Sequence, residues 1–205
     1  LELVSRGQRN IYDVAVSPLM DLFTRDNTND GGGWNVRLSY VPHGAQMGYP
    51  WLFINFPEEI VQPLADYGGG SPCGSLFVDE STLPDELAHS LYTCDWGRSV
   101  IYRHPLTPNG AGFTAEQESF VELPRPTDME IDAAGNIYIS SWKDGGFNFS
   151  NPNVGYVVKV KPPAKGTTTA LRHAPQWRII SPTPRLATSC ALSGVPCLPR
   201  SVRRP

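Results

Sequence analysis

Short apolar runs alternate with turn-forming residues along most of this chain. The runs are rich in Val, Ile, Tyr and Phe, and clusters of Gly, Pro, Asn and Asp separate them. This pattern is typical of antiparallel strands joined by tight turns. No long stretch carries apolar residues at helical spacing. The pattern therefore predicts an all-β protein.

One segment of the chain occurs twice, at residues 9–24 and again at 125–140. When Asp13 is aligned with Asp128, an alternating strand, a turn and a second strand coincide in the two copies. The apolar positions then stay in register, with Val16 on Ile131 and Leu22-Phe23 on Ile137-Tyr138. A repeat that preserves the strand register indicates two copies of one structural unit.

A weaker third copy lies between these two, with strands expected at 73–78, 90–94 and 99–103. A repeat of about four strands in roughly 40 to 50 residues favours the blade of a β-propeller over a sandwich. A propeller closes with about four to eight blades. Residues 1–161 have room for about three to three and a half, so we expect a partial β-propeller whose missing part is N-terminal.

Composition divides the chain in two. Residues 1–161 carry 10 Lys and Arg against 20 Asp and Glu, whereas residues 162–205 carry 7 basic residues and no acidic residue. The tail at 162–205 is rich in Pro, Thr, Ser and Arg, and this composition predicts disorder. A basic arm for nucleic acid is the alternative, but the charges are too dispersed to form a patch. No apolar run is long enough to cross a membrane.

The four cysteines fall into two pairs. Cys73 and Cys94 adjoin strands of the middle repeat, where they form either a disulfide, as in an oxidising compartment, or two buried thiols. Cys190 and Cys197 lie in the tail, and their spacing matches neither a haem-attachment motif nor a zinc site.

An acidic loop follows the strand that ends at Thr24. Asp26, Thr28 and Asp30 present oxygen atoms at alternate positions before Gly31, which resembles the first half of a calcium loop. The glutamate that closes such a loop is missing, because position 37 is Arg. The alternative is a turn whose side chains bind their own backbone.

Arginines precede the equivalent strands of the two clearest repeats. Inner strands of a propeller converge on a central channel, so Arg9, Asn10 and Arg125 are expected around one axial site that binds carboxylates or phosphates. The alternative pairs each arginine with the aspartate of its own blade, Arg9 with Asp13 and Arg125 with Asp128.

Asp95, Trp96 and Arg98 lie between two expected strands, where they could form the lip of a ligand pocket or a tight hairpin with Asp95 paired to Arg98. The four histidines, His43, His89, His104 and His173, show no spacing that marks a metal site or a catalytic triad.

Several of these motifs together resemble a known family. Arg9-Asn10, the acidic loop and Met47-Gly48-Tyr49-Pro50 resemble elements of the soluble quinoprotein glucose and sorbosone dehydrogenases. The segments 70–74, 92–98 and 125–128 look closer to a branch of planctomycete-type bacteria described as membrane-bound dehydrogenase domains. The resemblance covers about residues 5–161.

The resemblance implies a six-bladed propeller that holds pyrroloquinoline quinone (PQQ) and calcium and oxidises a sugar or other alcohol. Arg9, Asn10 and Arg125 match quinone-contacting positions of the glucose enzymes. Thr127 stands where those enzymes have a second arginine, and Arg98 takes the place of a nearby lysine. The resemblance further implies a periplasmic location and a c-type cytochrome as electron acceptor.

The catalytic base of the glucose enzymes is a histidine in a blade before Arg9-Asn10, a region outside this chain, so we expect the chain to be inactive alone. Two other interpretations stay open. One is a noncatalytic propeller that binds a glycan or a partner protein through Tyr49, Trp51, Trp96 and Trp142. The other is a truncated chain without independent function.

Overall fold

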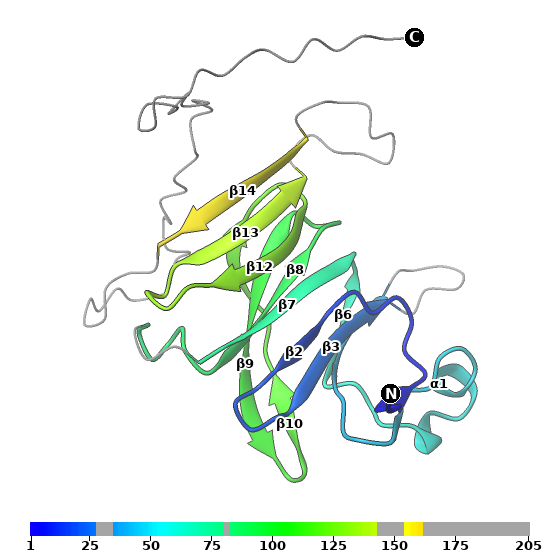
Figure 1. Cartoon of the computed structure of the whole chain (residues 1–205). Coiled ribbons are helices and arrows are strands. Elements are labelled where there is room, and N and C mark those ends of the chain that lie inside the picture. Colours follow the sequence, from blue (N-terminus) through cyan, green and yellow to red (C-terminus); the bar gives the residue numbers. More distant parts are fainter. Residues whose placement is uncertain (28–34, 80–82, 143–153, 162–205) are drawn as a thin grey trace, which may run out of the picture.

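The computed structural model describes residues 1–27, 35–79, 83–142 and 154–161. The tail at 162–205, with its expected disorder and its two cysteines, lies outside these residues. Nearly all the regular structure is β, and three antiparallel sheets succeed one another along the chain (Figure 1). The predicted partial β-propeller is confirmed, and each sheet is one blade.

Each blade is a meander of neighbouring strands. Blade 1 contains β2 (Val14–Val16), β3 (Leu22–Asn27), β4 (Asn35–Tyr40) and β6 (Ala65–Gly69). Blade 2 contains β7 (Pro72–Val78), β8 (Ser90–Asp95), β9 (Val100–Asn109), β10 (Gly112–Ala115) and β11 (Glu118–Glu122). Blade 3 contains β12 (Pro126–Ile131), β13 (Ile137–Trp142) and β14 (Gly155–Val160).

The repeat alignment holds in three dimensions. Val16 pairs with Leu22 in blade 1, and Ile131 pairs with Ile137 in blade 3. The aligned aspartates also have the same local role, because Asp13 and Asp128 each accept a hydrogen bond from the N–H of the next residue, at 2.8 and 2.9 Å. The two copies are therefore equivalent inner strands and their hairpins.

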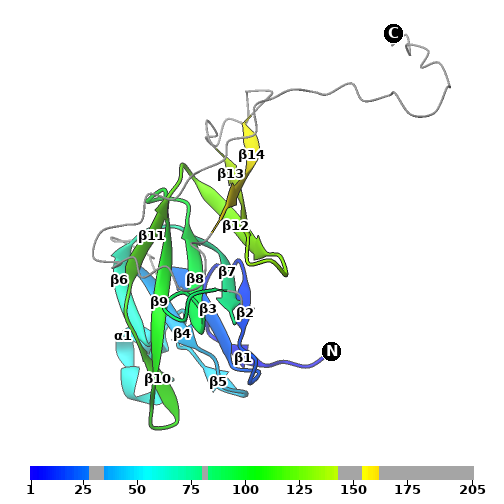
Figure 2. The same cartoon turned by 90° about the vertical axis from the view of Figure 1, so that its left-hand side faces the viewer.

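The inner strands β2, β7 and β12 lie side by side and hold the blades together as an arc (Figures 1 and 2). Asp13 reaches from blade 1 to blade 2, where its Oδ2 accepts the N–H of Ser75 at 2.7 Å. On the other side of β7, Asp128 occupies the space where a side chain of residue 74 would lie: a Cβ on Gly74 would be 2.2 Å from its Oδ1. Gly74 therefore allows the inner strands of blades 2 and 3 to approach closely.

Two apolar clusters fill the spaces between the blades. The smaller, between blades 1 and 2, is built on Phe23, Leu38 and Leu91. The larger, between blades 2 and 3, includes Tyr92, Ile101 and buried residues of β13 and β14. Alternation along the strands produces this arrangement, since Ile137 and Ile139 face the cluster while Tyr138 and Ser140 face away.

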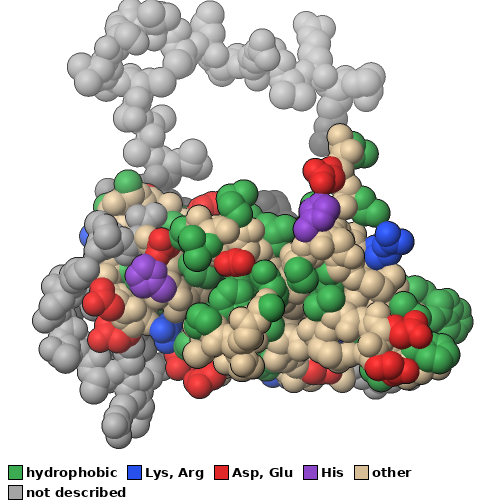
Figure 3. All heavy atoms as spheres, turned by 90° about the horizontal axis from the view of Figure 1, so that it is seen from below, with side chains coloured by type: hydrophobic (Ala, Val, Ile, Leu, Met, Phe, Trp, Pro, Cys, Tyr) green, Lys and Arg blue, Asp and Glu red, His purple; other side chains and the backbone are tan. Residues whose placement is uncertain are grey.

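The remaining described elements flank blade 1. β1 (Ser5–Arg6) pairs in parallel with β5 (Ala45–Gln46), and a short helix α1 (Leu52–Asn55) precedes a 3₁₀ turn η1 (Pro57–Glu59). Val14 and Val16 are exposed, on the opposite face of β2 from the buried Ala15. Hydrophobic side chains also gather on the face seen from below (Figure 3). Among the described residues, no helix is long and apolar enough to span a membrane.

Candidate functional site

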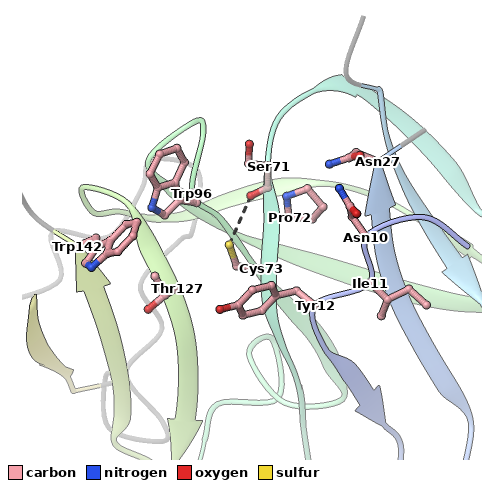
Figure 4. Close-up of a pocket in the computed structure, with 10 residues that line it drawn as sticks. All are labelled: Asn10, Ile11, Tyr12, Asn27, Ser71, Pro72, Cys73, Trp96, Thr127 and Trp142. Carbon is pink, nitrogen blue, oxygen red and sulfur yellow. Dashed lines mark hydrogen bonds between the residues drawn. The ribbon is translucent and has the colours of Figure 1, made fainter. Parts of the chain in front are cut away.

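A pocket of about 740 Å³ lies where the three blades converge (Figure 4). Its walls come from the entry to β2, the end of β3, the start of β7, the turn after β8, and blade 3. The lining residues are Asn10, Ile11, Tyr12, Asn27, Ser71, Pro72, Cys73, Trp96, Thr127 and Trp142. This volume is in the range of small-molecule and cofactor sites.

One wall of the pocket is aromatic and carries a positive charge. Trp96 and Trp142 meet edge to face with their ring centroids 6.1 Å apart. The guanidinium of Arg125 lies 3.9 Å from the centre of the Trp96 ring, and the Arg125 carbonyl accepts the N–H of Trp142 at 3.0 Å. The wall therefore combines flat apolar faces with a cation held against one of them.

Arg9 and Asn10 lie at the opposite side of the pocket. Asn10, with a φ of 50°, lines it directly. The Arg9 side chain donates a hydrogen bond to Oδ1 of Asn27, another lining residue, and its guanidinium lies 5.9 Å from the Tyr49 ring centre. Arg9 and Arg125 thus each contact a residue that lines the cavity, although neither is itself among the lining residues.

The alternative arrangement, in which Arg9 pairs with Asp13 and Arg125 with Asp128, is not found among the described residues. Asp13 accepts backbone N–H groups of Val14 and Ser75, and Asp128 accepts that of Met129. Burial raises the pKa of Asp128 above its usual range, while the Met129 N–H bond opposes this effect and the nearby charge of Asp13 adds to it.

Arg98 binds the backbone of β6. Its exposed side chain donates hydrogen bonds to the carbonyls of Gly69 and Tyr67 on β6, the latter at 3.3 Å. Its backbone N–H donates to Asp95 at 3.0 Å. The expected Asp95–Arg98 pair is thus made through the Arg98 backbone, and Arg98 is not among the residues that line the pocket.

Of the three candidate calcium ligands, only Asp26 lies within the described residues. Both Asp26 oxygens are bound by Arg37, Oδ1 from Nε at 3.1 Å and Oδ2 from Nη2 at 2.6 Å, and the N–H of Arg9 donates to Oδ2 at 3.1 Å. The carboxylate is buried and has its charge balanced, so it does not fit as a calcium ligand. Thr28 and Asp30 lie outside the described residues. In the part of the chain that the structure describes, no group of three or more His, Cys, Asp or Glu residues could hold a metal.

The two cysteines of blade 2 are free thiols. Cys73 lines the pocket, and burial raises its pKa to about 11. Cys94 is fully buried beneath it, and burial raises its pKa well above the usual value. The structure therefore shows two free thiols that resist ionisation, of which Cys94 is buried and Cys73 is partly buried.

A buried polar network behind the pocket was not anticipated from the sequence. Arg25 of β3 is 2% exposed and crosses from blade 1 to blade 2, where Nη1 donates to Thr93 Oγ1 at 2.8 Å and Nη2 lies 3.5 Å from Asp95 Oδ2. Thr93 Oγ1 is 2.8 Å from His104 Nε2. Burial lowers the pKa of Arg25, and the Asp95 charge opposes this effect.

The aromatic residues suggested for a binding propeller are divided between two places. Trp96 and Trp142 line the pocket, together with the exposed Tyr12. Trp51 is exposed next to α1, and Tyr49 stacks on Phe53 with ring centroids 6.2 Å apart. The structure therefore brings only the first pair together.

No family model and no curated protein matches the chain. Solved structures do share its fold. A Thermus thermophilus oxidoreductase described as a glucose dehydrogenase is 19% identical over 77% of this chain and 47% of its own, with a TM-score of 0.63. The PQQ-bound aldose sugar dehydrogenase of Streptomyces coelicolor is 19% identical over 77% of this chain and 44% of its own, with a TM-score of 0.58.

A further glucose dehydrogenase is 20% identical over 79% of this chain and 46% of its own, with a TM-score of 0.60. The chain thus spans a little under half the length of the solved structures that it matches. At this level of identity the likeness shows the fold, which is that of β-propeller dehydrogenases.

Proposed function

We propose that this chain forms part of the cofactor pocket of a PQQ-dependent sugar or alcohol dehydrogenase. The observation that carries the proposal is the pocket itself, which has a tryptophan wall and two lining residues, Asn27 and Trp96, that contact Arg9 and Arg125. A propeller of the same fold has been solved with PQQ bound. The remaining blades of the ring would come from outside this chain.

The residues present suit such a ligand. PQQ is a planar tricyclic quinone with three carboxylates, which needs flat faces to stack on and cations to bind its edges. Trp96 and Trp142 offer the faces. Arg125 beside Trp96 and Arg9 beside Asn27 would offer the cations. The amides of Asn10 and Asn27, which line the pocket, add donors and acceptors.

The chain's own residues would bind and orient, while the bound quinone would supply the chemistry by accepting a hydride from the sugar carbon. None of the described residues that line the pocket carries a carboxylate or an imidazole. On the family resemblance, the proton acceptor would be a histidine of a blade outside this chain. On the same resemblance, we place the complete protein in the bacterial periplasm, with a c-type cytochrome as its electron acceptor.

Calcium is the weaker part of the proposal. Asp26 is bound to Arg37 and cannot supply a ligand without breaking that pair. Any calcium ion would need oxygens from Thr28, Asp30 or the missing blades.

Titration of PQQ into the folded chain, followed by its absorbance and by tryptophan quenching, tests the proposal. We expect Arg125→Ala and Arg9→Ala each to weaken binding by about 10- to 100-fold, as expected for loss of a charged hydrogen bond. Arg103→Ala, which removes a pair with Glu118 and a hydrogen bond to Ser90 and lies outside the pocket lining, is the control and should bind like the unmodified chain. Failure of the folded chain to bind PQQ would refute the proposal.

A noncatalytic carbohydrate-binding propeller is the second candidate. The aromatic side chains that line the pocket, including the exposed Tyr12, favour it. Binding of a sugar without PQQ, abolished by Trp96→Ala, would support this candidate.

A further inference from the structure

Asp95 lies at the end of β8, where three segments of the chain meet. It is 1% exposed. Its Oδ1 accepts the N–H of Ser71 at 2.9 Å and that of Arg98 at 3.0 Å, while its Oδ2 faces Arg25 Nη2 at 3.5 Å. A single carboxylate therefore connects blade 1, the entry to β7 and the turn after β8.

The segments that Asp95 holds are those that build the pocket. Ser71 begins the lining stretch that continues through Pro72 and Cys73, and Trp96 follows Asp95 directly. The carbonyl of Ser71 accepts the N–H of Trp96 at 2.9 Å, which closes a small ring of hydrogen bonds around the carboxylate. Figure 4 shows Ser71, Cys73 and Trp96 arranged around one cavity.

The fit around the carboxylate is close. A Cβ on Gly70 would lie 2.3 Å from Asp95 Oδ2, and a Cβ on Gly97 would lie 3.1 Å from the Ser71 nitrogen. Glycine at both positions lets the backbone approach the carboxylate and the Ser71 segment. The backbone next to Asp95 and Trp96 is thus closely packed.

A buried ion pair is a poor source of stability, because desolvation offsets most of the attraction between the charges. The Arg25–Asp95 pair is nonetheless completely buried, and Arg25 Nε has no hydrogen-bond partner among the described residues. Its evident effect is geometric, since it fixes the carboxylate that in turn fixes Ser71 and Trp96.

We propose that Asp95 is a positioning residue of the pocket, which holds Trp96 and the Ser71–Cys73 segment in the arrangement that receives a flat ligand. The identity of that ligand rests on the proposed function. The positioning role does not, because it can be measured without any ligand.

The test compares Asp95→Ala and Asp95→Asn with Tyr92→Phe. The asparagine keeps an acceptor for the two backbone N–H groups but loses the charge that faces Arg25. Tyr92→Phe removes a buried hydrogen bond to the Leu87 carbonyl, 2.8 Å long, in the core of the same blade. It therefore destabilises blade 2 without touching the pocket.

The first measurement is the rate at which a thiol reagent modifies Cys73, followed by peptide mass spectrometry to separate it from the other cysteines. We expect Asp95→Ala to raise this rate about tenfold or more under conditions in which the chain stays folded, because the segment opens more readily. Tyr92→Phe should leave the rate within about twofold, and Asp95→Asn should lie between the two. The second measurement is the PQQ dissociation constant, which should rise about tenfold in Asp95→Ala and be partly restored in Asp95→Asn.

The outcomes separate the two proposals. If the unmodified chain fails to bind PQQ while Asp95→Ala still raises the Cys73 rate selectively, the proposed function is lost and the positioning role stands. If Asp95→Ala leaves the rate unchanged, or changes it no more than Tyr92→Phe does, the positioning role is overturned. Should Asp95→Ala not fold, the comparison of Asp95→Asn with Tyr92→Phe decides by the same criterion.

Discussion

His104 should make the stability of this protein depend on pH. Its ring is completely buried between Tyr67 and Thr93. The Glu116 carbonyl lies 3.0 Å from Nδ1 and can only accept, so Nδ1 carries the hydrogen. In the neutral ring, Nε2 accepts from the Thr93 hydroxyl, which in turn receives a hydrogen bond from Arg25. The neutral imidazole therefore satisfies every partner in the network.

The size of the effect follows from the pKa of His104. Burial, reinforced by the nearby Arg25 charge, lowers it to about 3 from an ordinary value of 6.5, while the bond to the Glu116 carbonyl opposes the shift. Between these two values the unfolded chain binds a proton that the folded chain does not. The stabilising contribution of His104 to the free energy of unfolding is therefore fully present above about pH 6.5 and decreases as the pH falls towards 3. At about 1.36 kcal/mol per pH unit, the free energy of unfolding is lower by about 3 kcal/mol at pH 4 because of this group.

Urea unfolding of the chain and of His104→Gln between pH 4 and 7.5 measures this contribution. The variant should be less stable at pH 7, because it loses the fitted ring and its hydrogen bonds. It should also have a smaller slope of unfolding free energy with pH, by up to about 1.4 kcal/mol per unit below pH 6. Other titrating groups cancel in the comparison. Parallel pH profiles for the two proteins would refute the argument.

Two further substitutions, one of them with a control, test other contacts. Gly74→Ala should lower the unfolding free energy by about 3 kcal/mol, because the new methyl group would lie 2.2 Å from Asp128 Oδ1 and 2.6 Å from Asp128 Cα. The control Gly155→Ala, whose methyl group would meet nothing closer than 4.0 Å, should change the unfolding free energy by less than about 0.5 kcal/mol. Asp26→Asn should cost about 3 kcal/mol through loss of the Arg37 pair, equally in EDTA and in calcium. A loss seen only with calcium would instead make Asp26 a metal ligand.

The fold was accessible from the sequence because blades are local structures. The register that aligns Val16 with Ile131 depends only on alternation within short strands, and the observed pairs Val16–Leu22 and Ile131–Ile137 follow from it. The strands of blade 2 are predictable from the sequence for the same reason. The side-by-side arrangement of the blades follows from the repeat, because equivalent units in sequence form equivalent blades.

The candidate site was only partly accessible. Asn10 lies at the start of a repeated segment and lines the pocket. Arg25 and Asp95, in contrast, stand 70 positions apart in the sequence, and no periodicity connects them. His104 was set aside because it has no histidine or carboxylate at a useful spacing, whereas its actual partners are a hydroxyl and a carbonyl.

The Asp26–Arg37 pair has a signal in the sequence. The two residues face each other on neighbouring strands of one hairpin, although position 37 is also where a calcium loop would have its closing glutamate. An oxygen-rich turn looks the same whether its carboxylate binds a cation in solution or an arginine on the next strand. The pairing of β3 with β4 decides between them.

The position of blade 2 between two apolar clusters has a consequence for hydrogen exchange. Blades 1 and 3 each share one of these clusters, whereas blade 2 is covered on both sides. All six residues of β8 are buried. Their amides should therefore exchange with solvent only when most of the protein unfolds, while those of β2 and β14 exchange through smaller openings. Blade 2 would be the last cooperative unit of the arc to open.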